Sequence, residues 1–310
     1  MQNQVKIRNQ QINKSMSLRN ILKGTGVALV TPFKQNLEID FNALEKLINY
    51  DINNGCEYLV SLGTTGETPT LTEEEKIELI NFTYDIVKDR VPVVIGIGGN
   101  STKEVCNNLE TYPLHKSTAV LSASPYYNKP SQEGIYFHYK TIANASPKAI
   151  IIYNVPGRTG SNVTACTTLK LAAEVDNIGG IKEASGNMVQ CMHILQHRPE
   201  RFLVVSGDDH LALPLIACGM DGVISVAANC FPKVFSEMVR LALHDDLNKA
   251  RTLHYKCLEG NDLLFAENNP AGVKAFLTEL GIIENILRLP LVPLSKDLHK
   301  KVKQYLSKNF

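Results

Sequence analysis

IGGIKEASG, residues 178–186, is a short apolar segment that leads into a lysine, Lys182, and then into a polar turn. Further apolar runs of similar length, rich in β-branched residues, alternate with helical patterns from residue 26 onward. These runs are GVALVT (26–31), YLVSLG (58–63), VPVVIGIG (91–98), TAVLSAS (118–124), AIIIYN (149–154), FLVVSG (202–207) and GVISVA (222–227). Continuous apolar strands are typical of a parallel sheet that is covered on both faces.

Strands that alternate with helices at a spacing of roughly 20–35 residues predict an α/β fold, a (β/α)8 TIM barrel. Helix starts are marked in TEEEK (72–76), where acidic residues follow Thr72, and in PSQEG (130–134). A doubly wound sheet is the alternative, but no GxGxxG motif opens the first helix. The motif-like GIGGNS (96–101) follows the third strand and lacks the spacing.

Three regions are expected along the chain. Residues 1–20 are polar and basic, lack an apolar signal-peptide core, and predict a flexible N-terminal arm. Residues 21–243 form the predicted barrel, and residues 244–310 a small C-terminal helical appendage. The helices expected after the last strand are 231–243, which can close the barrel, 247–264, 270–280 and 295–308.

The composition indicates a globular protein, with 44% hydrophobic and 20% charged residues and a net charge of +1. No basic stripe suggests a nucleic-acid partner, and no apolar run approaches the roughly 18 residues of a membrane span. The seven cysteines and eight histidines form no CxxC, HxxxH or HExxH pattern. We therefore expect no metal site and no disulfide framework, in a reducing, cytoplasmic environment.

In a barrel of this kind the chemistry gathers at the carboxyl ends of the strands. Polar and glycine residues occur at the ends of six predicted strands. They are GTTGE (63–67), SPYYNKP (124–130), YNVPGRTG (153–160), KEASG (182–186), SGDD (206–209) and SVAAN (225–229).

Lys182 is the candidate nucleophile at this mouth. Strand alternation places Lys182 and Gly180 on one face and Glu183 on the other, so an inward lysine has no carboxylate partner beside it. Lost hydration then favours the neutral, nucleophilic amine, and Gly180 is expected to leave room for a substrate. If the register is shifted by one residue, Lys182 instead faces the helices.

Four residues could complete the site. Tyr153 can relay protons, although a core tyrosine would look the same. Thr64 and Thr65 lie in a glycine-bracketed turn that could bind a carboxylate, or could be an ordinary turn. Arg158 suits a second carboxylate, unless it is a solvated surface side chain.

Without a metal cluster, a carbonyl substrate needs covalent activation. An imine on Lys182 would supply the electron sink. The residues therefore predict a Schiff-base lyase or aldolase that acts on a 2-oxo acid.

GTTGETPTL, SPYYNKPSQEG, YNVPGRTG, GIKEASGN, SGDD and GVISVAAN together resemble the dihydrodipicolinate synthase family. The match runs in order from about Gly24 to LRLPLVP, which ends at residue 293. N-acetylneuraminate lyase and other pyruvate aldolases share the barrel, the lysine and the tyrosine, so VPGRTG is the discriminating part. The chain departs from familiar members at HKSTAV (115–120), where we expect an altered loop and retained chemistry.

The resemblance implies that Lys182 forms the pyruvate imine. Tyr153 and Thr64 resemble two members of a proton relay, and Tyr127 its third member, lent by a neighbouring subunit. Thr65 resembles a threonine that binds the carboxylate of pyruvate.

The remaining substrate contacts also follow from the resemblance. Arg158 is implied to anchor the carboxylate of the aldehyde substrate. Gly207 and Ile224 match positions whose backbone carbonyls lie near the lysine.

The implied reaction condenses pyruvate with L-aspartate 4-semialdehyde to 4-hydroxy-tetrahydrodipicolinate, on the diaminopimelate route to lysine. It needs no cofactor, and the implied assembly is a homotetramer, a dimer of tight dimers. One alternative is another pyruvate-dependent class I aldolase, resembling N-acetylneuraminate lyase or a keto-sugar-acid aldolase. Another is a catalytically silent barrel that serves as a sensor or scaffold.

An effector site for L-lysine is the last implication of the resemblance. Asn100, Glu104 and Tyr126 match positions of this site. Sensitive relatives often carry histidines where this chain has Glu73 and Lys76, and Pro69 replaces a small residue nearby. Because Lys76 adds a cation beside a cationic ligand, we expect weak or absent inhibition by L-lysine.

Overall fold

The computed structural model describes residues 17–309. Most of the arm expected at residues 1–20 therefore lies outside the described residues. The expectation of a loose segment is wrong for residues 18–20, which belong to helix α2 (Leu18–Ile21). Leu18 is buried in the barrel-interior cluster, and its packing against Gly179 anchors this helix below the sheet.

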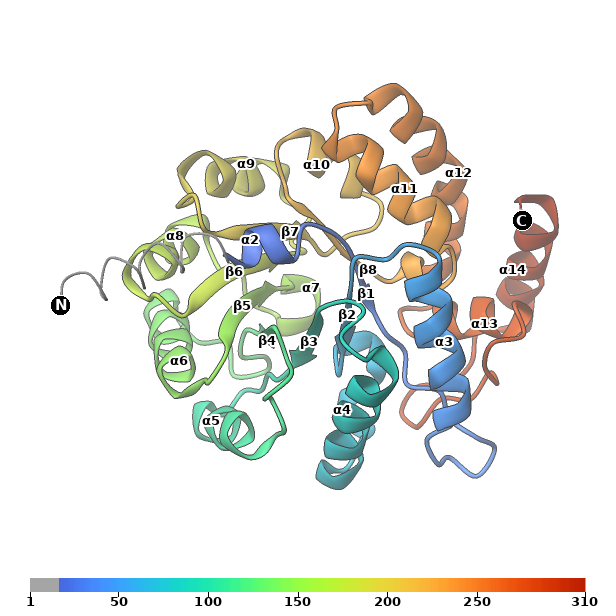
Figure 1. Cartoon of the computed structure of the whole chain (residues 1–310), viewed down its shortest axis with the longest axis horizontal. Coiled ribbons are helices and arrows are strands. Elements are labelled where there is room, and N and C mark those ends of the chain that lie inside the picture. Colours follow the sequence, from blue (N-terminus) through green and yellow to red (C-terminus); the bar gives the residue numbers. More distant parts are fainter. Residues whose placement is uncertain (1–16, 310) are drawn as a thin grey trace.

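Eight parallel strands close into a barrel in chain order, with β8 paired to β1 (Figure 1). Their bounds are β1 Gly24–Ala28, β2 Tyr58–Ser61, β3 Val93–Gly96, β4 Ala119–Ala123, β5 Ala149–Asn154, β6 Ile178–Glu183, β7 Leu203–Ser206 and β8 Gly222–Ser225. The closure confirms the predicted (β/α)8 barrel and excludes the doubly wound sheet.

Helices follow the strands, and all except the short α7 form an outer ring around the barrel (Figure 1). They are α3 Phe41–Asn53, α4 Glu73–Val87, α5 Thr102–Thr111, α6 Gln132–Ala145, α7 Pro156–Thr159, α8 Ala165–Glu174, α9 Met188–His197, α10 Ala212–Ala217 and α11 Pro232–Leu243. Both predicted helix starts are confirmed. Thr72 and Glu75 form a capping box at the start of α4, and the Ser131 hydroxyl accepts from the Gly134 N–H at the start of α6.

The C-terminal region adds helices at one side of the barrel (Figure 1). They are α12 Leu247–Phe265, α13 Ala271–Glu279 and α14 Lys296–Asn309. Their buried residues join the same hydrophobic cluster that lies between the strands and the outer helices. The appendage therefore packs on the barrel directly, and our division at residues 243/244 falls in the short connection between α11 and α12.

Two hydrophobic clusters sit on opposite faces of the sheet. One fills the barrel and includes Tyr58, Leu121 and Ile224, while the other lies under the helices and includes Ile181. The strands thus alternate between an inner and an outer face, except at a register shift in β6 between Ile178 and Gly180. Within residues 17–309, no helix combines the length and the apolar character that crossing a membrane requires.

Candidate active site

Lys182 points into the barrel from β6. It pairs with Tyr153 of β5 on one side and with Val205 of β7 on the other, and both belong to the interior cluster. Its side chain is only 5% exposed, and Nζ lies 4.3 Å from the centroid of the Tyr153 ring. The inward register is therefore the correct one, and the lysine does not face the helices.

Glu183 lies on the opposite face and is committed to other partners. Its carboxylate accepts hydrogen bonds from Asn154 Nδ2 (2.9 Å), Gln190 Nε2 (3.0 Å) and the Ser185 N–H (2.7 Å). Among the ion pairs of residues 17–309, none includes Lys182. The buried amine is consequently without a carboxylate partner in the described part of the chain.

Two glycines beside the lysine have different roles. A Cβ atom at Gly207 would lie 2.9 Å from Lys182 Cε, so glycine is needed there for the lysine side chain to pass. The expectation for Gly180 is wrong. A Cβ there would meet Leu203 at 2.7 Å, so its missing side chain makes room for Leu203 and not for a substrate.

A cavity of about 670 Å³ opens at the carboxyl-terminal mouth. Six of the predicted site residues line it: Thr64, Thr65, Tyr153, Arg158, Lys182 and Gly207. They come from the connection after β2, from β5 and α7, from β6, and from the residue after β7. The fold thus gathers positions far apart in sequence around the Lys182 amine.

Asn269 joins two of these residues and was missed by the sequence reasoning. Its Nδ2 donates to Thr65 Oγ1 (2.9 Å), and its carbonyl accepts from Arg158 Nη2 (3.2 Å). Asn269 lies just before α13, far along the sequence from the strand ends at which site residues are predicted. It fixes the relative position of the two groups that are candidates for carboxylate binding.

Asp208 and His210 also line the cavity, and neither had a predicted role. His210 Nε2 lies 3.0 Å from Asp262 Oδ1, and Nδ1 lies 3.6 Å from Asp208 Oδ1. The hydrogen bond to Asp208 raises the pKa of His210 above its ordinary value, assisted by Asp262 and opposed by partial burial. The sequence marked SGDD only as the end of a strand, and the fold shows that His210, directly after this motif, contacts Asp262 of α12.

Two predicted residues lie outside this cavity. Ile224 is buried deeper in the barrel, within the interior cluster. Tyr127 is 89% exposed and has a positive φ of 71°, a backbone conformation that is uncommon for a residue with a side chain. Neither residue lines the cavity around Lys182.

A second cavity of about 350 Å³ shares Thr64, Tyr153 and Arg158 with the first. Of the predicted effector residues, Tyr126 and Lys76 line it, together with Pro69, whereas Asn100 and Glu104 do not. Asn100 lies in the connection between β3 and α5, and Glu104 lies in the first turn of α5.

Lys76 is held in place by Glu73, whose carboxylate lies 2.7 Å from Nζ. Glu73 also accepts a hydrogen bond of 2.5 Å from the Tyr112 hydroxyl. The hydrogen bond from Lys76 lowers the pKa of Glu73, with Tyr112 contributing in the same direction. The side chain of Lys76 is only 15% exposed, so its cation stays at this cavity.

Metal coordination has no candidate in the described part of the chain, where no group of three His, Cys, Asp or Glu side chains converges. All seven cysteines are free. The polar groups that line the main cavity are an amine, a phenol, a guanidinium, hydroxyls, the Asp208–His210 pair and the amides of Asn268 and Asn269.

A closed (β/α)8 barrel with such a cavity at its carboxyl-terminal mouth is the architecture of a barrel enzyme. The chain belongs to the Dihydrodipicolinate synthetase family, whose model matches residues 21–309. This confirms the resemblance inferred from the motifs.

Individual relatives support this family assignment. The chain is 54% identical over 285 residues to the 4-hydroxy-tetrahydrodipicolinate synthase of Parabacteroides distasonis, covering 92% of this chain and 96% of the relative. The solved dihydrodipicolinate synthase of Thermotoga maritima is 40% identical, with a TM-score of 0.90, over 93% of this chain and 99% of that one. The enzyme of Cyanidioschyzon merolae, solved with lysine bound, is 36% identical with a TM-score of 0.89, over 93% and 98%. The shared name confirms the predicted lyase activity, the condensation of pyruvate with L-aspartate 4-semialdehyde.

Proposed function

We propose that Lys182 carries this reaction as a covalent imine with pyruvate. The observation that carries the proposal is a buried lysine amine without a carboxylate partner, 4.3 Å from the Tyr153 ring at a barrel mouth. Nζ attacks the ketone carbon of pyruvate, a carbinolamine forms, and water leaves. Loss of a methyl proton then gives the enamine.

The enamine carbon attacks the aldehyde carbon of L-aspartate 4-semialdehyde and forms the new C–C bond. The amine of that substrate then displaces Lys182, which closes the ring and frees the enzyme. Tyr153 and Thr64 move protons during these steps, since both line the cavity that holds the amine.

The two carboxylates of the substrates have separate binding groups in this proposal. The Thr64–Thr65 turn binds the carboxylate of pyruvate, and the guanidinium of Arg158 binds that of the semialdehyde. Asn269 supports both, because it contacts Thr65 through its side chain and Arg158 through its carbonyl. Gly207 and Ile224 contribute backbone carbonyls near the lysine.

Tyr127 completes the relay from a neighbouring subunit. Its high exposure on a single chain, next to the partly exposed Tyr126, supports a position at a subunit contact. The proposed assembly is a cytoplasmic homotetramer built as a dimer of tight dimers. Asn100, Glu104, Tyr126 and Lys76 would lie near that contact as an effector site of reduced lysine affinity.

A substrate panel tests the function against the alternative of another pyruvate aldolase. We expect condensation of pyruvate with L-aspartate 4-semialdehyde and no efficient cleavage of sialic or keto-sugar acids. The Arg158→Ala variant should still form the pyruvate imine but lose the semialdehyde reaction by about 10²-fold or more. Cleavage of a sugar acid without condensation would refute the proposal.

A further inference from the structure

Glu67 and Lys274 form an ion pair that is sealed from solvent. Both side chains are 0% exposed, and Lys274 Nζ lies 2.5 Å from Glu67 Oε1. Nζ also donates to the Ile286 carbonyl (2.8 Å) and lies 4.2 Å from the centroid of the Phe33 ring. The other carboxylate oxygen of Glu67 accepts from the Arg288 N–H (3.0 Å). Lys274 thus has an ion pair and a backbone hydrogen bond, and Glu67 has the same ion pair through Oε1 and a backbone hydrogen bond through Oε2.

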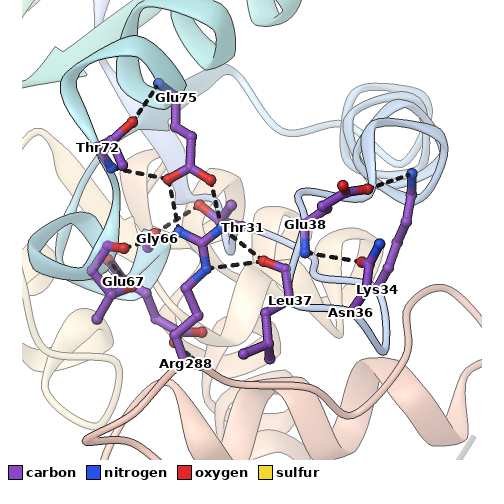
Figure 2. A network of polar contacts seen from close by, with 11 residues as sticks. Thr31, Lys34, Asn36, Leu37, Glu38, Gly66, Glu67, Thr72, Glu75 and Arg288 are labelled. Carbon is purple, nitrogen blue, oxygen red and sulfur yellow. Dashed lines mark hydrogen bonds and ion pairs between the residues drawn. The ribbon is translucent and has the colours of Figure 1, made fainter.

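Glu67 ends the Thr64–Gly66 turn, which lines the active-site cavity. Its φ of 52° is in the left-handed region, a conformation that a glutamate keeps only when its surroundings hold it there. The carbonyl of the preceding Gly66 accepts from Thr31 Oγ1 (2.7 Å). Figure 2 shows Gly66 and Glu67 beside the guanidinium of Arg288.

Arg288 extends the same network toward the surface. Its guanidinium donates to both carboxylate oxygens of Glu75 (2.7 and 2.5 Å) and to the Leu37 carbonyl (2.7 Å) (Figure 2). It also lies 4.4 Å from the centroid of the Phe33 ring, and Lys274 Nζ makes a similar contact with the same ring. The C-terminal region therefore holds the turn through several polar contacts and not through one.

Helix α13 touches the turn in two places. Lys274 lies in its first turns, and Asn269, which donates to Thr65 Oγ1, directly precedes it. The two contacts come from one short segment and meet the turn at Thr65 and Glu67, which are separated only by Gly66. A shift of α13 would therefore move the hydroxyl of Thr65 relative to the Lys182 amine.

We propose that Glu67 and Lys274 are a positioning pair, which sets the geometry of the pyruvate-binding turn by tying it to α13. The inference rests on the proposed role of Thr64 and Thr65 in binding the pyruvate carboxylate. A buried ion pair is seldom more stabilising than apolar residues of the same volume, but its geometry is directional. The pair therefore determines the position of the turn relative to α13 and also keeps the turn packed against the helix.

Three variants test this pair through the KM for pyruvate, kcat and Tm. Lys274→Met should raise the KM for pyruvate about tenfold or more, with a smaller change in kcat, and should lower Tm because Glu67 is left unpaired. The double variant Glu67→Gln/Lys274→Met removes both charges at similar volume. It should recover most of the Tm and still show the raised KM. If Lys274→Met does not fold, the KM of the double variant for pyruvate tests the positioning role without it.

Arg198→Met is the matched control. Arg198 pairs with the buried Asp221 just ahead of β8, at the opposite end of the barrel. It should lower Tm while the KM for pyruvate stays within about twofold of the parent, since no substrate group lies there. A double variant with a parental KM, or a rise in KM for Arg198→Met equal to that of Lys274→Met, would overturn the positioning role.

Thr65→Val separates this inference from the proposed function beneath it. A raised KM for pyruvate in Thr65→Val, together with a parental KM in the double variant, would overturn the positioning pair alone. A parental KM in Thr65→Val would show that the turn does not bind pyruvate, and would overturn both.

Discussion

Gly207 lies so close to Lys182 that a Cβ atom at this position would stand 2.9 Å from the lysine Cε and 3.1 Å from its Cγ. The same atom would lie 2.7 Å from Ala184 Cβ, so it could not simply move away. The path of the lysine side chain across the mouth therefore depends on the absence of a side chain at the residue that directly follows the neighbouring strand β7.

Gly207→Ala should displace the Lys182 amine and reduce kcat/KM by about 10²-fold, because small misplacements of a reacting group are costly. Gly134→Ala is the control, since its Cβ would meet Pro130 at 3.1 Å in α6, outside the cavity. Steady-state kinetics with pyruvate and L-aspartate 4-semialdehyde measure both. Parental activity of Gly207→Ala would show that the lysine does not need this path.

Tyr127 should act across a subunit contact. Tyr127→Phe and Lys182→Ala subunits are each expected to be inactive alone, and mixing them should restore activity. Each mixed dimer then contains one site with both groups intact. Mass spectrometry of the intact mixture controls for subunit exchange. Exchange without recovered activity would argue against a shared site.

L-lysine should inhibit weakly or not at all. The Lys76 cation is held by Glu73 at 2.7 Å beside the cavity that Tyr126 lines. Like charges at 4 Å cost about 1 kcal/mol in water and more when partly desolvated. The Lys76→His variant should gain sensitivity, and Lys76→Met separates the loss of charge from the gain of an imidazole. Half-inhibition of the parent at sub-millimolar L-lysine would contradict this prediction.

Asp51 should make stability fall as pH rises. Its carboxyl is fully buried in α3, no described residue donates to it, and burial raises its pKa well above the ordinary value. The folded chain then keeps a proton that the unfolded chain releases above about pH 4, so the folded state loses free energy relative to the unfolded one with increasing pH.

Asp51→Asn removes this titration. Its stability relative to the parent should improve by about 1.4 kcal/mol for each pH unit between the unfolded and folded pKa of Asp51. Thermal melts from pH 4 to pH 8 measure the difference, with the exposed Asp85→Asn of α4 as control. Parallel pH profiles of Asp51→Asn and the parent would count against a protonated Asp51.

Most strands of the barrel could be predicted from the sequence, because parallel strands that are buried on both faces appear as continuous apolar runs. Alternation along the strand also predicted that Lys182 and Glu183 point in opposite directions. Helix starts were clear where a side chain caps the backbone, as at Thr72 and Ser131. These features depend on residues that are close together in the sequence, so they can be predicted from the sequence alone.

The errors and omissions concern contacts between distant segments. Gly180 was interpreted as room for a substrate, but only the sheet shows that Leu203 occupies that space. Asn269 lies 204 residues after its partner Thr65, and Lys274 is similarly far from Glu67. No local pattern marks such residues, since their importance comes from where the closed barrel places them.

The central claim is that Lys182 carries the pyruvate imine. The most direct measurement is incubation of the chain with pyruvate and borohydride, followed by peptide mass spectrometry. The account predicts one reduced adduct per chain, on the peptide containing Lys182, and no adduct in Lys182→Ala. An adduct on a different lysine, or undiminished trapping in Lys182→Ala, would contradict it.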